Sequence, residues 1–206
     1  MIQEAAEVAQ WLECGVAKHT LAGETESGDG HLVEVTSDTA LLAVVDGLGH
    51  GPEAAVAART AVATLAEYAR EPLVALTQRC HEALRRTRGV VMSLAALNES
   101  EQAMTWLGVG DVDGVLLRPG PSVRRESLLT RGGVVGYQLP TLRAAMLPIQ
   151  RGDVLILATD GIRSGYSEEL NLHDTSQQIA DHILAKWCRG TDDALVLVAR
   201  YRGSKP

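Results

Sequence analysis

One segment of the sequence strongly constrains its own local structure, because an apolar run in it ends at a single charged residue that glycines follow. Residues 41–60 read LLAVVDGLGHGPEAAVAART, so a run of strand type reaches Asp46 and then breaks into glycines. Pro52 stands where a helix would begin, since its fixed φ suits the first helical turn. The alanine-rich sequence after it has apolar residues at helical spacing. The pattern predicts a buried strand, a glycine loop and a helix, with a carboxylate at the junction.

The apolar run has a partner strand just before it in the sequence. The two segments are residues 29–36 and 40–45. Both are short and rich in strand-forming residues, and a polar turn at Asp38 separates them, which predicts a β-hairpin. A turn centred on Asp38 places Asp29 opposite Asp46 or Gly47. Like charges that face each other destabilise a sheet unless a cation neutralises them.

The rest of the chain separates helical from strand-like segments. A second helix is expected from Pro72 to near Gly89, and a third over residues 175–189. Strand-like runs lie at 90–97, 102–110, 114–118, 127–130, 134–139, 151–161 and 194–201. Regular strands with turn signals favour antiparallel sheets, and segregated helices favour an α+β fold over βαβ alternation. We therefore expect one domain over residues 1–206, a sandwich of antiparallel sheets covered by helices.

Composition narrows the class of protein. The net charge of −7 argues against nucleic acid or an anionic membrane as the main partner. The three cysteines, Cys14, Cys80 and Cys188, have no CxxC spacing and are expected to be reduced thiols. The N-terminal residues lack the basic and apolar regions of a signal peptide, and no apolar run approaches the roughly 20 residues of a membrane helix. We expect a cytoplasmic protein.

A second group of carboxylates is expected at the other end of the sequence. Asp160 ends one apolar strand and Asp192-Asp193 precedes another, so the three side chains adjoin if these strands are antiparallel neighbours. An aspartate at a strand end is more often a turn residue or a helix cap, and the sequence alone leaves that interpretation open. If the two groups converge, their oxygen donors select Mg²⁺ or Mn²⁺. Two such ions about 3.5–4 Å apart can activate a water and clamp a phosphoryl group.

Four sequence blocks resemble the signature of the PPM-type, metal-dependent protein serine/threonine phosphatases. They are SGDG at 27–30, VVDGLGHG at 44–51, ILATDGI at 156–162 and TDDALVLV at 191–198. They occur in the order of the family and span nearly the whole chain. The form DGxGHG resembles that of the SpoIIE-like branch. The resemblance implies a four-layer αββα sandwich with a dinuclear Mn²⁺ or Mg²⁺ site at one end.

The resemblance also implies roles for individual residues. The implied metal-binding set is Asp29, Asp46, Gly47, Asp160, Asp192 and Asp193, of which Asp46 and Asp160 are the implied catalytic residues. Asp46 matches the aspartate that bridges the two metals, and Gly47 matches the glycine whose carbonyl binds one of them. Asp192 matches the last acidic ligand, with Asp193 as the neighbour that orients it.

The chain departs from the family pattern at two places. No arginine precedes Asp29, where large members carry one that grips phosphate, so phosphate binding is expected to fall to metal-bound waters. The sequence GVGD at 108–111 stands where many SpoIIE-like members have an Ala-Gly-His block. His50, in the glycine loop, is a candidate general acid; the alternative is that it shapes the loop or contacts a ligand of the metal.

A bare catalytic domain of this length resembles the RsbX type within the SpoIIE-like branch. That resemblance implies hydrolysis of phosphoserine and phosphothreonine in phosphorylated STAS-domain proteins of the stressosome. The alternative is a phosphatase-like module without activity that docks signalling partners. Nucleotide binding is disfavoured, because the glycines after Asp46 read GxGxG instead of GxGxxG and the carboxylate would face a pyrophosphate.

Overall fold

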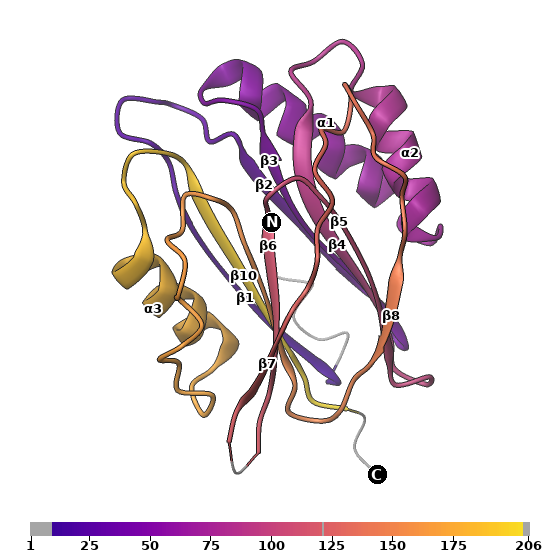
Figure 1. Ribbon diagram of the computed structural model, residues 1–206, viewed down its shortest axis with the longest axis vertical. Coiled ribbons are helices and arrows are strands. Elements are labelled where there is room, and N and C mark those ends of the chain that lie inside the picture. Colours follow the sequence, from indigo (N-terminus) through magenta and orange to yellow (C-terminus); the bar gives the residue numbers. More distant parts are fainter. Residues whose placement is uncertain (1–9, 121, 204–206) are drawn as a thin grey trace.

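The chain forms two antiparallel sheets packed face to face, with helices on both outer surfaces (Figure 1). The computed structural model describes residues 10–120 and 122–203, and these contain two five-stranded sheets and three helices. The expected α+β class and αββα layering are confirmed. The absence of a signal peptide was inferred largely from residues 1–9, which lie outside the described residues. No helix in the described part is both long and apolar enough to cross a membrane.

Each sheet has its own strand order. Sheet A consists, in spatial order, of β1 (Leu12–His19), β10 (Ala194–Tyr201), β9 (Val154–Ala158), β6 (Asp113–Arg118) and β7 (Arg124–Ser127). Sheet B consists of β2 (Asp29–Val35), β3 (Thr39–Gly47), β4 (Val90–Asn98), β5 (Ala103–Val109) and β8 (Ala145–Pro148). The helices are α1 (Pro52–Glu67), α2 (Leu73–Ala83) and α3 (Ser176–Trp187).

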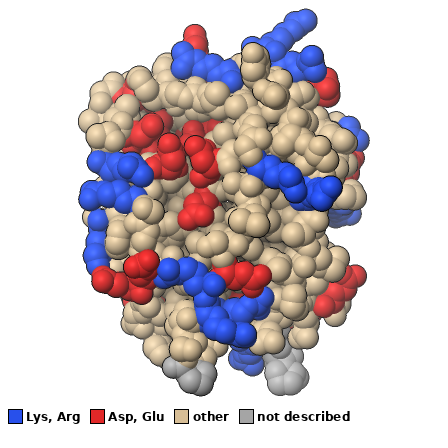
Figure 2. Space-filling model, in the orientation of Figure 1, with Lys and Arg blue, Asp and Glu red and all other residues tan. Residues whose placement is uncertain are grey.

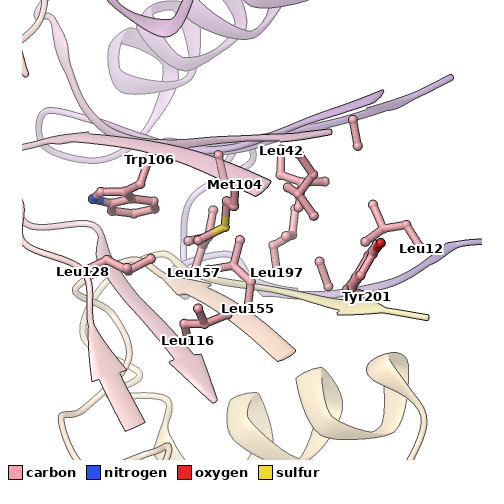
Figure 3. Packing of buried hydrophobic residues seen from close by; sticks show 14 of the residues in the cluster. Leu12, Leu42, Met104, Trp106, Leu116, Leu128, Leu155, Leu157, Leu197 and Tyr201 are labelled. Carbon is pink, nitrogen blue, oxygen red and sulfur yellow. The ribbon is translucent and has the colours of Figure 1, made fainter. Parts of the chain in front are cut away.

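The central strands are apolar throughout because both of their faces are buried. In β3, Leu42 and Val44 point into the core between the sheets, whereas the alternate residues Leu41 and Val45 point toward the helices. Figure 3 shows side chains of the two sheets meeting in the inter-sheet core, with Trp106 among them. This double burial explains why the run before Asp46 has no polar alternation, and it fixes the strand that carries that aspartate.

The helices complete the outer layers. Helix α1 lays small residues such as Ala57 and Ala61 on sheet B, which lets its backbone approach the strands closely. Helix α3 packs Ile179 and Ile183 on sheet A, and it begins with a capping box between Thr175 and Gln178. Figure 1 shows α1 and α2 on one side of the sandwich and α3 on the other.

Several expected element boundaries were wrong. The structure adds β1 and β8, which were not expected, and it replaces the strand expected at 127–130 by β7. The expected strand at 134–139 is a turn with isolated bridges, because Gly136 adopts a φ of 101° that interrupts extended structure. Helix α2 stops at Ala83, short of the end expected near Gly89. All of these are edge or boundary segments, and the central strands were placed correctly.

Candidate active site

The ends of four strands bring together the aspartates that the sequence singled out. In the β2–β3 hairpin, Asp29 pairs directly with Asp46, which confirms the expected register. Strands β9 and β10 are antiparallel neighbours, so Asp160, just after β9, adjoins the Asp192-Asp193 pair just before β10. The two groups belong to different sheets and reach the same end of the sandwich. Figure 2 shows acidic side chains gathered in a hollow, with Lys and Arg on both sides.

The carboxylates are close enough to raise one another's pKa. Burial raises the pKa of Asp46 to about 9, and the charges of Asp29 and Asp160 add to the rise. Burial also raises the pKa of Asp29 to about 7, partly offset by a hydrogen bond from Thr159. This interaction crosses from one sheet to the other. The charges of Asp160 and Asp192, which flank strands of sheet A, raise the pKa of both Asp29 and Asp46 in sheet B. The site is thus a group of acidic side chains partly withdrawn from water, and the raised pKa of Asp29 and Asp46 shows that these side chains do not readily ionise together.

Thr159 ties the two sheets together beneath the carboxylates. Its hydroxyl donates to Asp29 Oδ2 at 2.8 Å and accepts a hydrogen bond from the backbone N–H of Leu195 at 2.9 Å. Asp29 belongs to sheet B, whereas Thr159 follows β9 of sheet A. The sequence interpretation missed this residue, although a lone hydroxyl at the end of an otherwise apolar strand was a signal for it. Its side chain fixes the orientation of the Asp29 carboxylate.

Asp193 holds the segment that connects β1 to β2. Its Oδ1 accepts from the N–H of Leu21 at 2.9 Å, and its Oδ2 accepts from the N–H of Gly28 at 2.7 Å. Asp192 is less buried, and its Oδ1 accepts from the N–H of Asp193 at 2.8 Å. Both oxygens of Asp193 therefore engage backbone donors, whereas the Oδ2 of Asp192 has no hydrogen-bond partner within the described part of the chain.

The glycines after Asp46 allow helix α1 to begin directly against the strand ends. A Cβ on Gly47 would lie 2.3 Å from the carbonyl oxygen of Ala54, so a side chain cannot be placed there without movement of the helix. Gly51 precedes the helix with a φ of 76°, a conformation that glycine adopts without strain. These contacts give a packing reason for the glycine loop that is independent of any ligand.

His50 lies at the outer side of the glycine loop. Its Nδ1 is 2.6 Å from Oε1 of Glu24, and the imidazole is largely exposed. The pairing joins the glycine loop to the β1–β2 connection. The candidate role of His50 as a general acid stays a prediction.

Asp111 was not among the predicted site residues, and the structure places it beside the carboxylates. Its charge raises the pKa of both Asp46 and Asp160. It follows Gly110, whose φ of 94° turns the chain at the end of β5. The signal was the GVGD block at 108–111, which was noted as a departure from the family pattern but not connected to the acidic group.

A cavity of about 560 Å³ adjoins Asp29 and extends along the outside of sheet B. It is lined by small residues of α1 such as Ala55 and Ala58, and by His31 of β2 and Lys18 of β1. This cavity provides room, next to the acidic hollow, for groups larger than a phosphoryl group.

The donor chemistry of the hollow fits a hard divalent cation. The clustered side chains are carboxylates, the ligands that Mg²⁺ and Mn²⁺ prefer. Among the described residues, no group of three or more His, Cys, Asp or Glu side chains is positioned to hold a metal ion. The carboxylates share one hollow but do not surround a common ion position. Mg²⁺ keeps several waters when few carboxylates bind it, so a full set of protein ligands is not required.

Comparison with known proteins gives a consistent result. Residues 36–202 match the family model of stage II sporulation protein E (SpoIIE). The chain is 25% identical over 140 residues to phosphoserine phosphatase RsbX of Bacillus subtilis (strain 168), covering 68% of this chain and 69% of RsbX. A crystal structure of RsbX in complex with magnesium has a TM-score of 0.82 at 21% identity, covering 92% of this chain and 94% of that one.

Two further solved structures are similar. One is described as the bacterial stressosome, a modular system adapted to control secondary messenger signalling; its chain has a TM-score of 0.84 at 34% identity, covering 92% of this chain and 99% of that one. The other is the catalytic domain of the serine/threonine phosphatase PstP in complex with two manganese ions, with a TM-score of 0.71 at 20% identity and coverages of 92% and 97%. Structures of this fold thus bind magnesium or manganese. The family match spans most of the chain, so the protein belongs to the SpoIIE family of PPM-type phosphatases and is a homologue of the phosphoserine phosphatase RsbX.

Proposed function

We propose that the chain hydrolyses phosphoserine and phosphothreonine in proteins, with two Mn²⁺ or Mg²⁺ ions held in the acidic hollow. The proposed ligands are Asp29, Asp46, Asp160 and Asp192 with the carbonyl of Gly47, and residues 1–206 are proposed to act as a single catalytic domain. The observation that carries the proposal is the approach of carboxylates from two separate sheets, because Asp160 and Asp192 of sheet A raise the pKa of Asp29 and Asp46 of sheet B. Such a concentration of buried charge is costly unless cations bind to it.

The residues of the chain would divide the work as follows. Divalent ions, when bound, supply an activated water and neutralise the charge of the phosphoryl group. Asp46 and Asp160, from opposite sheets, would be ligands of the ions. Thr159 keeps Asp29 oriented through its 2.8 Å hydrogen bond. We assign Asp193, predicted as a ligand neighbour, to anchoring the β1–β2 segment, because both of its oxygens accept from backbone N–H groups.

The substrates in this proposal are phosphorylated STAS-domain proteins of a stressosome, encountered in the cytoplasm. Support comes from similarity to RsbX over 68% of the chain and to a chain of a bacterial stressosome structure at 34% identity. The net charge of −7 fits a protein partner better than nucleic acid or an anionic membrane surface. The alternative function is a docking module without phosphatase activity, and the experiments below distinguish it from the proposed phosphatase.

The chemistry is tested by hydrolysis of p-nitrophenyl phosphate in Mn²⁺, with and without EDTA. We expect turnover that EDTA abolishes and that Asp46→Asn reduces at least about a hundredfold, because even groups behind a metal ligand typically change activity 10–100-fold. Asp38→Asn, in the hairpin turn, makes the same chemical change away from the carboxylates and should leave the rate unchanged. Turnover that persists in EDTA, or an Asp46→Asn variant as active as the parent, would rule out the mechanism.

The substrate assignment needs a separate assay. Phosphorylated STAS-domain proteins are incubated with the Mn²⁺-loaded enzyme, and loss of phosphate is followed by intact mass. We expect faster dephosphorylation than for an unrelated phosphoserine protein at equal concentration. Equal rates would remove the assignment to STAS-domain proteins and leave the phosphatase chemistry intact. Binding of these proteins without loss of phosphate, together with no turnover of p-nitrophenyl phosphate, would favour the docking module.

A further inference from the structure

The turn between α3 and β10 places an arginine against the acidic hollow. The Nε of Arg189 donates to the backbone carbonyl of Asp160 at 2.7 Å, and its backbone N–H donates to the carbonyl of Gly161 at 2.8 Å. Burial and neighbouring aspartates raise the pKa of Asp160, and the charge of Arg189 opposes that rise. The guanidinium therefore lies close to the Asp160 carboxylate and is held there by a hydrogen bond to the backbone.

The terminal nitrogens of Arg189 remain available. Within residues 10–120 and 122–203, neither Nη1 nor Nη2 of Arg189 has a hydrogen-bond partner, and the side chain is exposed. Other arginines near the glycine loop and the β1–β2 segment are engaged by carboxylates. Arg88 is paired with Glu53 at 2.6 Å, and Arg59 is paired with Glu26 at 2.9 Å. Arg189 thus differs from them in presenting two free donors next to the proposed metal ligands.

A second arginine stiffens the turn that carries Arg189. The Nη2 of Arg163 donates to the carbonyl of Cys188 at 2.9 Å, and its backbone N–H donates to the carbonyl of Trp187 at 2.9 Å. The residue before Arg189 is therefore tied to the loop that follows Asp160. The position of the Arg189 guanidinium is set by bonds at both ends of the turn.

We propose that Arg189 binds the phosphoryl group of the substrate through Nη1 and Nη2. This inference rests on the proposed function, because it places the phosphoryl group beside Asp160. A guanidinium matches the geometry of phosphate oxygens and donates two parallel charge-assisted hydrogen bonds. Its Nε is already occupied by the Asp160 carbonyl, so the fork is oriented before substrate arrives. This is a direct contact with substrate, in addition to whatever the ions provide.

The inference is tested with Arg189→Ala in the full chain loaded with Mn²⁺. For p-nitrophenyl phosphate, we expect KM to rise about ten- to hundredfold, the range that follows from loss of hydrogen bonds to a charged group. The inhibition constant of inorganic phosphate should rise in parallel, and the Mn²⁺ concentration for half-maximal activity should stay the same. Arg189→Lys keeps the charge without the fork, and we expect an intermediate KM.

Arg79→Ala is the matched control. Arg79 is bonded to Glu71 through Nε and Nη2 on α2, so the variant removes the same charge from another surface. Its KM and its inhibition by phosphate should equal those of the parent chain. If Arg189→Ala does not fold, the comparison is carried by Arg189→Lys, whose unchanged KM would overturn the inference.

Three other results would also overturn it. A shift in Mn²⁺ requirement with no change in phosphate inhibition would make Arg189 a positioning residue for Asp160. A KM that rises for a phosphoprotein but not for p-nitrophenyl phosphate would mean that Arg189 binds the protein and not the phosphoryl group. If the parent chain has no turnover, the proposed function fails, but calorimetric titration of the Mn²⁺-loaded chain with inorganic phosphate still tests Arg189. If the parent chain and Arg189→Ala then bind phosphate with equal affinity, the proposal that Arg189 binds the phosphoryl group is rejected.

Discussion

A glycine at position 47 suits both the packing of helix α1 and the proposed binding of a metal ion by the backbone carbonyl. It ends β3 one position after Asp46, and a Cβ there would lie 2.3 Å from the carbonyl oxygen of Ala54 and 2.9 Å from its carbonyl carbon. Helix α1 cannot move away easily, because Ala54 is fully buried. We expect Gly47→Ala to lower the free energy of unfolding by about 1–3 kcal/mol, as overpacking usually does. Urea denaturation in EDTA measures this without any contribution from metal.

Gly132→Ala controls for the general effect of replacing glycine, which includes the lower entropy of the unfolded chain. A Cβ on Gly132 has no heavy atom within 4 Å and no positive φ to oppose it. We expect this variant to stay within about 0.5 kcal/mol of the parent chain. If the two variants lose equal stability, the close approach of α1 to Gly47 is not what requires a glycine.

The sequence predicted some residues of the site and missed others for a physical reason. Asp29 and Asp46 were placed opposite each other because hairpin pairing follows from the position of the turn, and the register bears this out. Thr159 and Asp111 could not be placed in this way. Thr159 meets Asp29 only because two separate sheets pack together, and Asp111 reaches the acidic group through the turn after β5, which the register of the hairpin does not place.

The segment between β1 and β2 is held by Asp193, which directly precedes β10. The two carboxylate oxygens of Asp193 accept hydrogen bonds from the N–H groups of Leu21 and Gly28. In Asp193→Asn, an NH₂ group replaces one of these oxygens, so one of the two backbone N–H groups would face another donor and lose its acceptor. We expect Asp193→Asn to cost about 1–3 kcal/mol of unfolding free energy, the range for a buried polar group left unsatisfied. Amide hydrogen exchange at Leu21 and Gly28 should become faster. Both quantities are measured in EDTA.

Asp192→Asn separates anchoring from metal binding. The asparagine Oδ1 can still accept from the N–H of Asp193, so the β1–β2 segment should keep its slow exchange. The Mn²⁺ concentration required for activity should rise at least about tenfold, because even mutation of a residue that only hydrogen-bonds to a metal ligand weakens metal binding 10–100-fold. The reverse pattern, with slow exchange lost in Asp192→Asn and metal affinity lost in Asp193→Asn, would exchange the two roles.

Elements at the centre of each sheet were predictable, whereas among the edge strands only β2, the first strand of the hairpin, was predicted. Strands such as β3 and β10 are buried on both faces and read as continuous apolar runs. The edge strands β1 and β8 have one partner each, and β8 is four residues long and ends on Pro148. Proline is tolerated at an edge, but it argues against a strand when the sequence is read alone.

At the scale of the molecule, the acidic hollow lies where the strand ends of the two sheets meet. Sheet B contributes Asp29 and Asp46, and sheet A contributes Asp160 and Asp192, each from the end of a strand. The inter-sheet core beneath them is apolar, and Thr159 supplies a hydrogen bond across the gap. Without a cation, carboxylates on opposite sheets repel each other across this hollow. Cation binding there is therefore expected to stabilise the whole sandwich.

Thermal unfolding tests this coupling directly. Mn²⁺ at about one hundred times its dissociation constant should add about 2.7 kcal/mol, which raises Tm by roughly 5–10 °C for a domain of this size. Asp160→Asn removes one repelling carboxylate from sheet A, so in EDTA we expect a Tm equal to or above that of the parent chain. In Mn²⁺ the same variant should gain much less, because it has lost a ligand. If Mn²⁺ raises the Tm of the parent chain and of the variant equally, the ions bind elsewhere. If the variant has a lower Tm than the parent chain in EDTA, the Asp160 carboxylate stabilises the fold and does not destabilise it by repulsion.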